Sequence, residues 1–599
     1  MTDPKLALLS ADTDKVKEYV FESAKLPEIR GASMILDDLN WGYDDQGRLP
    51  ELQVQRTIGD LFLAKGLLCK RWPRGNLIYV GGGSLLALVP RDLADELKGE
   101  IESLYPTETG TATITCVWRP VVQHELQHGF GGYTYESLLA LQERLTPQER
   151  QRIADYYHEP DEKGDTITQE QFDRRKNFGE LVALQGVALR RAKEEKATAP
   201  LFEAVPYARR CAACEIRPAA KFVLTPEPRY LCSVCAQKFG PEARRRRKSR
   251  WLELFQEYWI GQGLQVNVGM AADLEDIGKD ATGKAKGYVA FIYADGNDVG
   301  KAVESARSIE DYQENSRALE DTTKAVTYRA LRKHLAVEQG KESPGSIRRF
   351  EIITIGGDDL LLIVPADAAL AVARDICLEF EQHLPEAGFV SSVKPTMSAG
   401  VVIAESHTPI YFLRDLAGDL LKSAKKRARE LTLREGTVDF LVLKSQTTLA
   451  TTLLHQRGAP PMTFTDRERK EKLLLTRRPY TLTELDRLIA SARDLETGGF
   501  PGSQLQGYRR ALRQGRLGAM FHFLYQYARA GDGQRRVLRR VFDRWRVPGE
   551  VDPQPWFDLN PQRGFTRYWT PWADIIEIMD FIRWLEGQSE GGEHLESRD

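Results

Sequence analysis

The feature of the sequence that most constrains the fold is an internal repeat. The segment IYVGGGSLLALVP (78–90) aligns with ITIGGDDLLLIVP (353–365) without a gap, at a constant offset of 275 residues. Upstream of each segment an apolar stretch ends in Ala-Asp, LALLSADTD (6–14) and YVAFIYADGND (288–298), so that Asp12 falls on Asp295. Two matches in the same order and at similar separation predict a duplicated domain rather than a chance similarity.

The two copies differ in the acidic residues of the hairpin. Asp358 and Asp359 of the second copy are replaced by Gly83 and Ser84 in the first. A pair of divalent ions needs several carboxylates that converge on it, and only the second copy offers them. Glycines allow a tight hairpin and a close approach of the backbone to a phosphate. The first copy keeps these glycines, so we expect it to retain the ability to hold a nucleotide.

The second copy also shows an ordered set of elements. A strand ending at Asp295 is followed by a helix, the Gly-Gly-Asp-Asp hairpin, another helix, the strand 396–404 and a helix over 413–430. This is the βαββαβ order of a ferredoxin-like domain. A chain of 599 residues is too long for one core, so we predict a multidomain α+β protein. The alternative is that the hairpin is an ordinary turn, because Gly and Asp are common turn residues.

Four cysteines form two Cys-x-x-Cys pairs, Cys211 with Cys214 and Cys232 with Cys235. Each pair presents two thiolates to one tetrahedral ion, and the spacing between the pairs is typical of zinc sites. Four thiolates leave no open position for water, so we predict structural zinc. A redox-active pair is the alternative. The seven cysteines fit a reducing compartment better than a disulfide framework.

Two further stretches have alternative interpretations. HELQH (124–128) matches the HExxH pattern of zinc proteases, but the glycines after it leave room for two helical turns at most, so we favour a structural role. The basic run ARRRRKSRW (243–251) is either a solvated surface or a contact for RNA or a partner subunit.

The remaining signals concern the C-terminal region and the location of the protein. Residues 455–599 show amphipathic spacing, as in ADIIEIMDFIRWLEG, and predict a helical domain with a small aromatic core. The net charge of −2 does not by itself indicate a nucleic-acid binder. The N-terminus does not show a signal peptide, and the apolar runs are too short to span a membrane. We therefore expect a cytoplasmic protein that does not contact a membrane.

The second copy resembles the palm domain of GGDEF diguanylate cyclases, class III nucleotide cyclases and polymerases, and AGDLLKSAKKRAR (417–429) looks like their conserved helix. The whole chain resembles the large polymerase/cyclase subunit of type III CRISPR effector complexes. The duplicated palm, KLPEIRGAS (25–33), the two Cys-x-x-Cys pairs between the palms, ADGNDVGK (294–301) and GGDD carry this resemblance. Many members begin with an HD nuclease domain, but the chain contains no His-Asp dipeptide. We therefore expect no intrinsic DNase activity.

The resemblance implies a role for each matching residue. Asp295 and Asp358 would bridge two Mg²⁺ or Mn²⁺ ions, and Asp359 would support the site. Together these three carboxylates would be the catalytic residues. The nucleotide-binding residues would be Gly296, Gly356, Gly357, Ser398 and Lys425 in the second palm, with Gly81 and Gly82 in the first.

The resemblance also implies a domain layout and a function. The first, degenerate palm would span 1–122, a mainly helical insert 123–204, the zinc module and basic linker 205–284, the catalytic palm 285–450 and the helical C-terminal domain 451–599. The protein would convert ATP to cyclic oligoadenylate when its complex, with crRNA and the other effector subunits, binds target RNA. Two alternatives are a GTP-using enzyme like the diguanylate cyclases and a non-catalytic scaffold.

Overall fold

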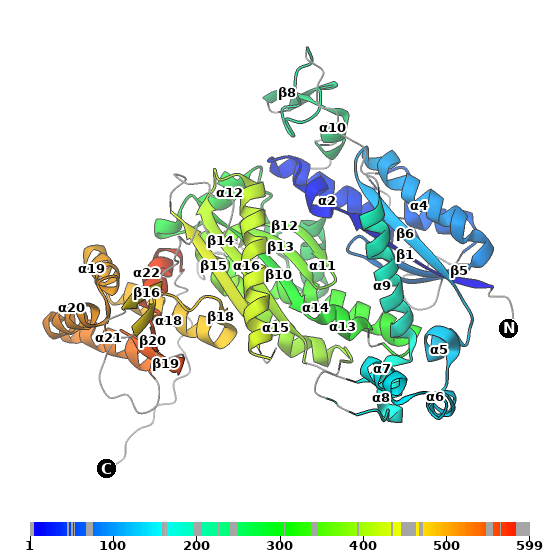
Figure 1. The fold of residues 1–599 in the computed structure, drawn as a ribbon. Helices are drawn as coiled ribbons and strands as arrows, with labels where there is room; N and C mark the ends of the chain where they lie inside the picture. Colours follow the sequence, from blue (N-terminus) through cyan, green and yellow to red (C-terminus); the bar gives the residue numbers. More distant parts are fainter. Residues whose placement is uncertain are drawn as a thin grey trace.

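Two similar sheet domains lie side by side in the computed structural model, and a third, mostly helical region follows the second of them (Figure 1). The structure describes residues 5–44, 47–48, 52, 54–67, 76–158, 162, 164–196, 207–225, 227–239, 249–304, 306–336, 346–391, 394–432, 435–444, 463–466, 471–546, 555–562 and 565–582. Cys69 and most of the basic run 243–251 fall outside these residues. Within them, no helix is both long and apolar enough to cross a membrane.

The first palm is a four-stranded antiparallel sheet in the order β4-β5-β1-β6. The central strand β1 carries the buried residues Ala7, Leu8 and Leu9, which explains why it forms the middle of the sheet. The strands are β1 (Leu6–Asp14), β4 (Leu77–Gly81), β5 (Ser84–Pro90) and β6 (Thr113–Val121), and the helices are α1 (Val16–Val20), α2 (Leu26–Asn40), α3 (Ile58–Ala64) and α4 (Ala94–Thr109). The short strands β2 (Tyr43–Asp44) and β3 (Gly47–Arg48) form a separate hairpin.

The second palm repeats this arrangement in the order β12-β13-β10-β14, and then continues with β15 and β18. Strand β15 runs parallel to β14, whereas the four palm strands are antiparallel. The strands are β10 (Tyr288–Asn297), β12 (Glu351–Gly356), β13 (Asp359–Pro365), β14 (Thr396–Glu405), β15 (Thr437–Leu443) and β18 (Tyr480–Thr481). The helices are α13 (Val299–Glu304), α14 (Ile309–Leu335), α15 (Ala369–Glu386) and α16 (Ile410–Glu430). The predicted α+β fold with duplicated ferredoxin-like palms is confirmed.

Strand register supports the alignment of the copies. Ala11 pairs with Leu85 in the first palm, and Ala294 pairs with Leu360 in the second. The backbone after the first strand is also repeated, because Lys15 and Asp298 both adopt the left-handed conformation, with φ of 49° and 53°. Left-handed conformations are uncommon for residues other than glycine, so their recurrence at equivalent positions indicates a shared backbone.

Between the palms lie an insert of helices and the four-cysteine module. The insert contains α5 (Glu125–His128), α6 (Tyr135–Gln142), α7 (Pro147–Tyr157), α8 (Gln169–Arg175) and α9 (Phe178–Glu195). Helix α9 packs on β6 and β1, just as α16 packs on β14 and β10, so it completes the first palm.

The four-cysteine module comprises β7 (Lys221–Thr225), β8 (Glu227–Leu231) and α10 (Ser233–Phe239), and it projects beside α2 (Figure 1). Glu22 pairs with both Arg217 and Lys238 of this module, and Arg229 pairs with the buried Glu28 of α2 at 2.9 Å. A side chain at Gly31 would collide with the carbonyl of Lys238. These contacts fix the module on the first palm. The connection to the second palm includes α11 (Arg250–Gly261), α12 (Leu274–Lys279) and the pair β9 (Asn267–Val268) and β11 (Ser346–Ile347).

The C-terminal region is less uniformly helical than the sequence predicts. Its helices are α18 (Leu482–Thr497), α19 (Gly502–Leu512), α20 (Arg516–Arg529), α21 (Asp532–Trp545) and α22 (Trp572–Ile578). They are joined by a sheet in the order β16-β17-β20-β19, formed by β16 (Thr463–Asp466), β17 (Glu471–Leu474), β19 (Phe557–Gln562) and β20 (Phe565–Trp569). The prediction of a purely helical domain is therefore wrong. Its strands pair residues nearly a hundred positions apart, which local periodicity cannot reveal.

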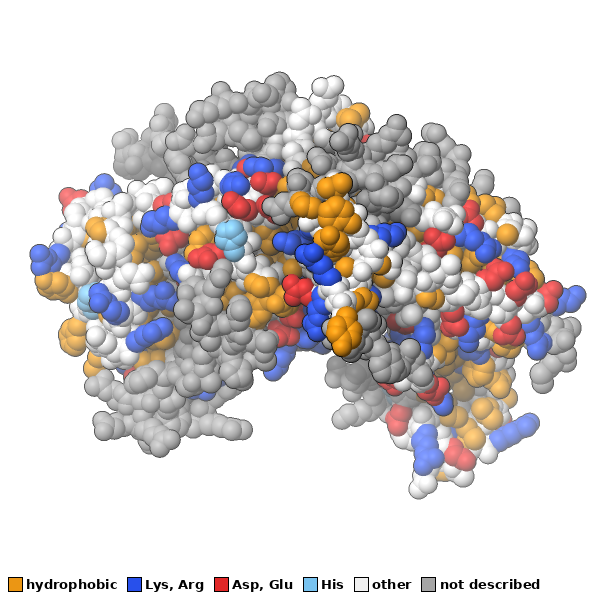
Figure 2. Space-filling view, turned by 90° about the horizontal axis from the view of Figure 1, so that it is seen from above, with side chains coloured by type: hydrophobic (Ala, Val, Ile, Leu, Met, Phe, Trp, Pro, Cys, Tyr) orange, Lys and Arg blue, Asp and Glu red, His pale blue; other side chains and the backbone are white. Residues whose placement is uncertain are grey.

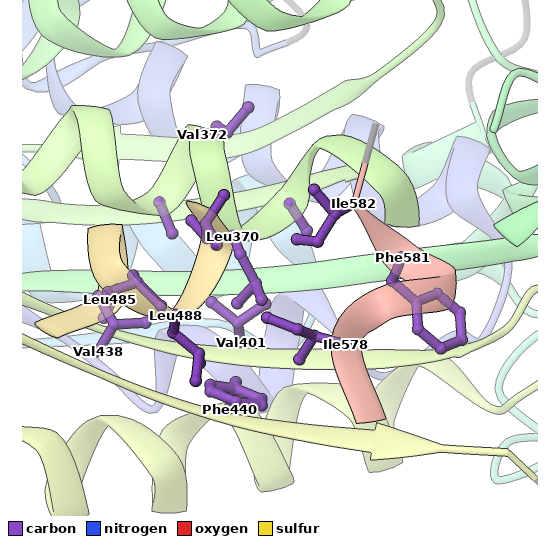
Figure 3. Close-up of a cluster of buried hydrophobic side chains, with 14 of the residues drawn as sticks. Leu370, Val372, Val401, Val438, Phe440, Leu485, Leu488, Ile578, Phe581 and Ile582 are labelled. Carbon is purple, nitrogen blue, oxygen red and sulfur yellow. The ribbon is translucent and has the colours of Figure 1, made fainter. Parts of the chain in front are cut away.

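The hydrophobic core crosses the boundary between the second palm and the C-terminal region. Val401, Val438 and Phe440 of the second-palm sheet pack with Leu488 and Ile578 of the C-terminal helices (Figure 3). A second core joins the first palm, the four-cysteine module and the opposite face of the second-palm sheet. The second palm is thus packed on both faces, which holds its hairpin in a fixed place.

Candidate active site

Three carboxylates converge at one end of the second-palm sheet. Asp295 lies near the end of β10, Asp359 begins β13, and Asp358 occupies the turn before it. The carboxyl groups of Asp358 and Asp295 are close enough to share a hydrogen bond. The side chains come from adjacent strands of an antiparallel sheet, so the fold itself brings them together.

The electrostatics of this group favour a bound cation. Burial, followed by the charge of Asp295, raises the pKa of Asp358 well above its usual range. The same two causes raise the pKa of Asp359 to about 6. The Oδ1 atom of Asp359 is shielded from solvent and has no hydrogen-bond partner. Oxygen ligands of this kind suit Mg²⁺ or Mn²⁺, so the residues fit the predicted divalent metal site.

Lys425 provides positive charge at the site. Its ammonium nitrogen donates to Asp295 Oδ2 at 2.6 Å and to the carbonyl oxygen of Gly296 at 2.8 Å. Helix α16 is held against the sheet by buried leucines, among them Leu416 and Leu420, which directs Lys425 to the carboxylates. Lys425 thus lies beside the acidic group, and its role in neutralising a triphosphate stays a prediction.

The glycines are required by close backbone contacts. A Cβ atom on Gly356 would lie 2.8 Å from Cα of Gly82, so the two Gly-Gly turns abut each other across the palms. A Cβ atom on Gly296 would lie 2.8 Å from Asp358 Oδ2. Gly357 has a φ of 61°, which a side chain would strain. The predicted glycines of both palms therefore lie at one junction.

Ser398 differs from the other predicted nucleotide-binding residues. It pairs with Asp295 across β14, but it is fully buried. Its hydroxyl accepts a hydrogen bond from Asn297 at 3.0 Å and contacts the hydroxyl of Thr437 at 3.3 Å. In this structure Ser398 supports the strand beneath Asp295 and is not open to a ligand.

The first palm has its own lysine and aspartate pair, which the sequence analysis missed. Lys193 of α9 donates to Asp12 Oδ2 at 2.5 Å and to the carbonyl of Thr13 at 3.0 Å. These are the same two contacts that Lys425 makes, because Asp12 corresponds to Asp295 and Thr13 to Gly296. The hydroxyl of Ser84 also donates to Asp12. A signal was present in the sequence, since Ala-Lys occurs at the same place in both helices.

A cavity of about 480 Å³ lies at the first-palm end of the junction. Both palms line it, and its lining includes Asp12, Gly81, Arg190, Gly300, Tyr312 and Gly357. This volume is in the range of pockets that hold small ligands.

The four cysteines form a compact buried cluster. Their sulfur atoms lie within 4.8 Å of one another, and those of Cys214 and Cys232 are 3.9 Å apart. The guanidinium of Arg217 lies 3.8 Å from the Cys214 sulfur. Four thiolates with a nearby cation fit a tetrahedral zinc ion.

The HELQH segment does not form a comparable site. The rings of His124 and His128 are 4.3 Å apart, on the short helix α5. The carboxylate of Glu125 accepts backbone hydrogen bonds from Val122 and Gly131, so it is engaged in the turn. Among the described residues, the four cysteines are the only group of three or more His, Cys, Asp or Glu side chains whose ligand atoms all lie within 4.8 Å of one another. The oxygens of Asp295, Asp358 and Asp359 are therefore spread more widely than the cysteine sulfurs.

The carboxylates, the glycine hairpin and Lys425 on a ferredoxin-like sheet define a palm domain. Residues 288–432 match the Cas10/Cmr2 second palm domain. A curated relative, the CRISPR system Cmr subunit Cmr2 of Pyrococcus furiosus, is 31% identical over 150 residues, which cover 23% of this chain and 17% of that one.

Solved structures also match the chain, at low sequence identity. A crystal structure of Csm1 in T. onnurineus matches with a TM-score of 0.52 and 12% identity, over 97% of this chain and 70% of that one. A structure of a Csm1–Csm4 cassette in complex with pppApA has a TM-score of 0.39 and 14% identity, over 73% of this chain and 54% of that one. The chain thus spans about half of that structure and 17% of the curated relative.

Residues 288–432 are thus similar to the second palm domain of Cas10/Cmr2 proteins, and the predicted resemblance to the large subunit of type III CRISPR complexes is confirmed.

Proposed function

We propose that this protein is a nucleotidyltransferase that converts ATP to cyclic oligoadenylate within a type III CRISPR complex. The observation that carries the proposal is the convergence of Asp295, Asp358 and Asp359 beside a glycine hairpin and Lys425. The raised pKa values of Asp358 and Asp359 indicate that the protein alone compensates their charge poorly. A bound cation would supply the missing compensation.

The reaction would join a 3′-hydroxyl of one nucleotide to the α-phosphorus of another, with pyrophosphate as the leaving group. Mg²⁺ or Mn²⁺ held by Asp295 and Asp358 would activate the hydroxyl and stabilise the developing charge. Asp359 would support this site, and Lys425 would neutralise the triphosphate. The turns at Gly356 and Gly357 would allow phosphates to approach the backbone.

The first palm would hold the acceptor nucleotide. Its cavity of about 480 Å³ reaches the second-palm hairpin, so an acceptor bound there would lie next to the proposed catalytic carboxylates. Asp12 is already neutralised by Lys193 and hydrogen-bonded by Ser84, so this half of the junction would bind without catalysing. Gly81 and Gly82 would provide the backbone contact.

The remaining assignments follow from the family of the second palm. The partners would be the other effector subunits, crRNA and target RNA, in the cytoplasm, and the four cysteines would hold a structural zinc ion. Acidic and basic side chains are intermixed on the face seen in Figure 2, in keeping with the net charge of −2. RNA would therefore act mainly through the assembled complex.

The test is to supply labelled ATP and GTP separately to the complex assembled with target RNA, with Mg²⁺ or Mn²⁺, and to separate the products. Cyclic oligoadenylate from ATP alone is the expected result. A product from GTP alone would favour the cyclase that uses GTP. A complex that binds target RNA but makes no product from either nucleotide would favour the scaffold alternative.

A further inference from the structure

The two clefts between the palms are lined by equivalent residues, with one exception. Val16 and Val20 of α1 line a cleft beside the second-palm sheet, and their counterparts Val299 and Val303 line the cleft beside the first. At the position between them, the first palm has Lys17 and the second has Gly300. Lys17 therefore extends toward the catalytic carboxylates, whereas the opposite cleft receives no side chain at this position.

Lys17 makes its contacts on the second palm. Its ammonium nitrogen donates to the hydroxyl of Tyr293 and lies 4.1 Å from the centroid of the Tyr293 ring. The same hydroxyl is hydrogen-bonded to Asp359. Lys17 as a whole is an exposed residue, although burial lowers the pKa of its ammonium group, an effect that the charges of Asp359 and Asp295 oppose.

The clefts also differ in size and in the residues around them. The positions equivalent to Tyr293 and Asp359 are Ser10 and Ser84, which are smaller and line the open cavity of about 480 Å³. The cleft that contains Lys17 has a volume of about 60 Å³.

The backbone that carries Lys17 is firmly held. Arg414 of α16 donates to the carbonyl oxygen of Lys17 at 3.2 Å, and its guanidinium lies over the Phe21 ring. The left-handed conformation of Lys15 starts the helix, and Val20 is buried. Lys17 thus reaches the second palm from a fixed base on the first.

We propose that Lys17 of the first palm binds the phosphates of the nucleotide held by the second palm. This inference rests on the proposed function. A lysine ammonium is a compact point charge suited to phosphate. Phosphates bound with divalent ions at Asp295 and Asp358 would arrive beside it and replace its present contact with Tyr293.

The experiment compares ATP and adenosine as ligands of the full-length chain. Dissociation constants for a non-hydrolysable ATP analogue with Mn²⁺, and for adenosine, are measured in a Lys193→Met background, which weakens the first-palm site. We expect Lys17→Met to weaken binding of the ATP analogue about tenfold and to leave adenosine unchanged. Lys17→Arg should recover most of the loss, because it restores the charge. Lys422→Met is the control, since Lys422 is an exposed cation of α16.

The outcomes separate the inference from the function on which it rests. Unchanged binding of the ATP analogue by Lys17→Met would overturn the inference. Equal losses in Lys17→Met and Lys17→Arg, accompanied by a lower melting temperature, would also overturn it and indicate a structural role. A wild type that makes no product can still show weaker binding of the ATP analogue on Lys17→Met. In that case the proposed function fails and the inference stands. A wild type that binds no ATP overturns both.

Discussion

The two palms share their backbone and differ in their charge. Both place a Gly-Gly turn at the same junction, both begin their first helix after a left-handed residue, and both direct a lysine to the aspartate of the first strand. In the first palm Ser84 satisfies that aspartate, whereas in the second palm Asp359 adds another negative charge at the same place. The comparison teaches that the two copies keep the same backbone geometry, while a few side chains would decide which copy holds a metal.

The largest expected effect comes from removing the charge that distinguishes the palms. Asp358→Ala with Asp359→Ala should lower product formation from ATP by at least about 100-fold, because the metal would lose its ligands. Folding should be retained, since two poorly compensated carboxylates are removed. Product analysis and a melting curve check this, with Ser84→Ala as the matched change in the first palm. Synthesis retained in the double variant would refute the assignment of the active site.

Loss of a zinc-binding cysteine should destabilise the first palm more than the second palm. Cys211→Ser or Cys232→Ser should lose zinc and destabilise the four-cysteine module, because structural zinc contributes directly to folding. The module contacts α2 through Glu28, so hydrogen exchange should increase in α2 before it increases in β10. Metal analysis of the purified protein is the first measurement. Wild-type protein without zinc would contradict the prediction.

The lysine pair tests whether the palms hold different nucleotides. Lys425→Met should mainly reduce kcat, since it acts at the catalytic carboxylates, whereas Lys193→Met should mainly raise the KM for ATP. We expect changes of roughly tenfold to thirtyfold, as for other lost charge-assisted contacts. Steady-state kinetics of both variants provide the test. If the two variants change kcat and KM to the same extent, the palms do not hold different nucleotides.

Gly300 offers a way to make the clefts more alike. Nothing lies within 4 Å of a Cβ atom at this position, and its φ is not in the left-handed region. Gly300→Lys should therefore fold normally and place a side chain in the open cavity, as Lys17 does opposite. We expect ATP stoichiometry or affinity at the first palm to fall roughly tenfold. Gly300→Ala, which leaves the cavity open, is the control and should bind ATP normally.

The smallest effect is a pH dependence confined to the second palm. Metal binding requires ionised carboxylates, and Asp359 has a pKa of about 6. Protons therefore compete with the metal at low pH, and Mn²⁺ affinity should increase as the pH rises through 6, with the raised pKa of Asp358 adding to this dependence. Titration calorimetry at several pH values measures this. Asp359→Asn should flatten the profile, and Asp12→Asn should leave it unchanged.

Much of this comparison could be predicted from the sequence, because an internal repeat indicates two domains with the same fold. The alignment of Asp12 with Asp295 and the nearness of Lys425 to the carboxylates follow from strand register and helix order. Lys193 was missed because four insert helices separate α9 from the strand that it covers. Lys17 was missed for another reason, since its contacts depend on how two domains dock. Contacts within one repeat can thus be predicted from the sequence more readily than contacts between the repeats.

The extension of the second-palm sheet has a consequence for truncation. Strand β18 from the C-terminal region pairs with β15, and Val438 and Phe440 of β15 are fully buried beneath the C-terminal helices. Removal of the chain beyond residue 450 would leave β15 as a bare edge strand with an apolar face, which is a template for intermolecular pairing. The second palm therefore depends on its C-terminal neighbour for solubility, even though all three catalytic carboxylates lie elsewhere in the sheet.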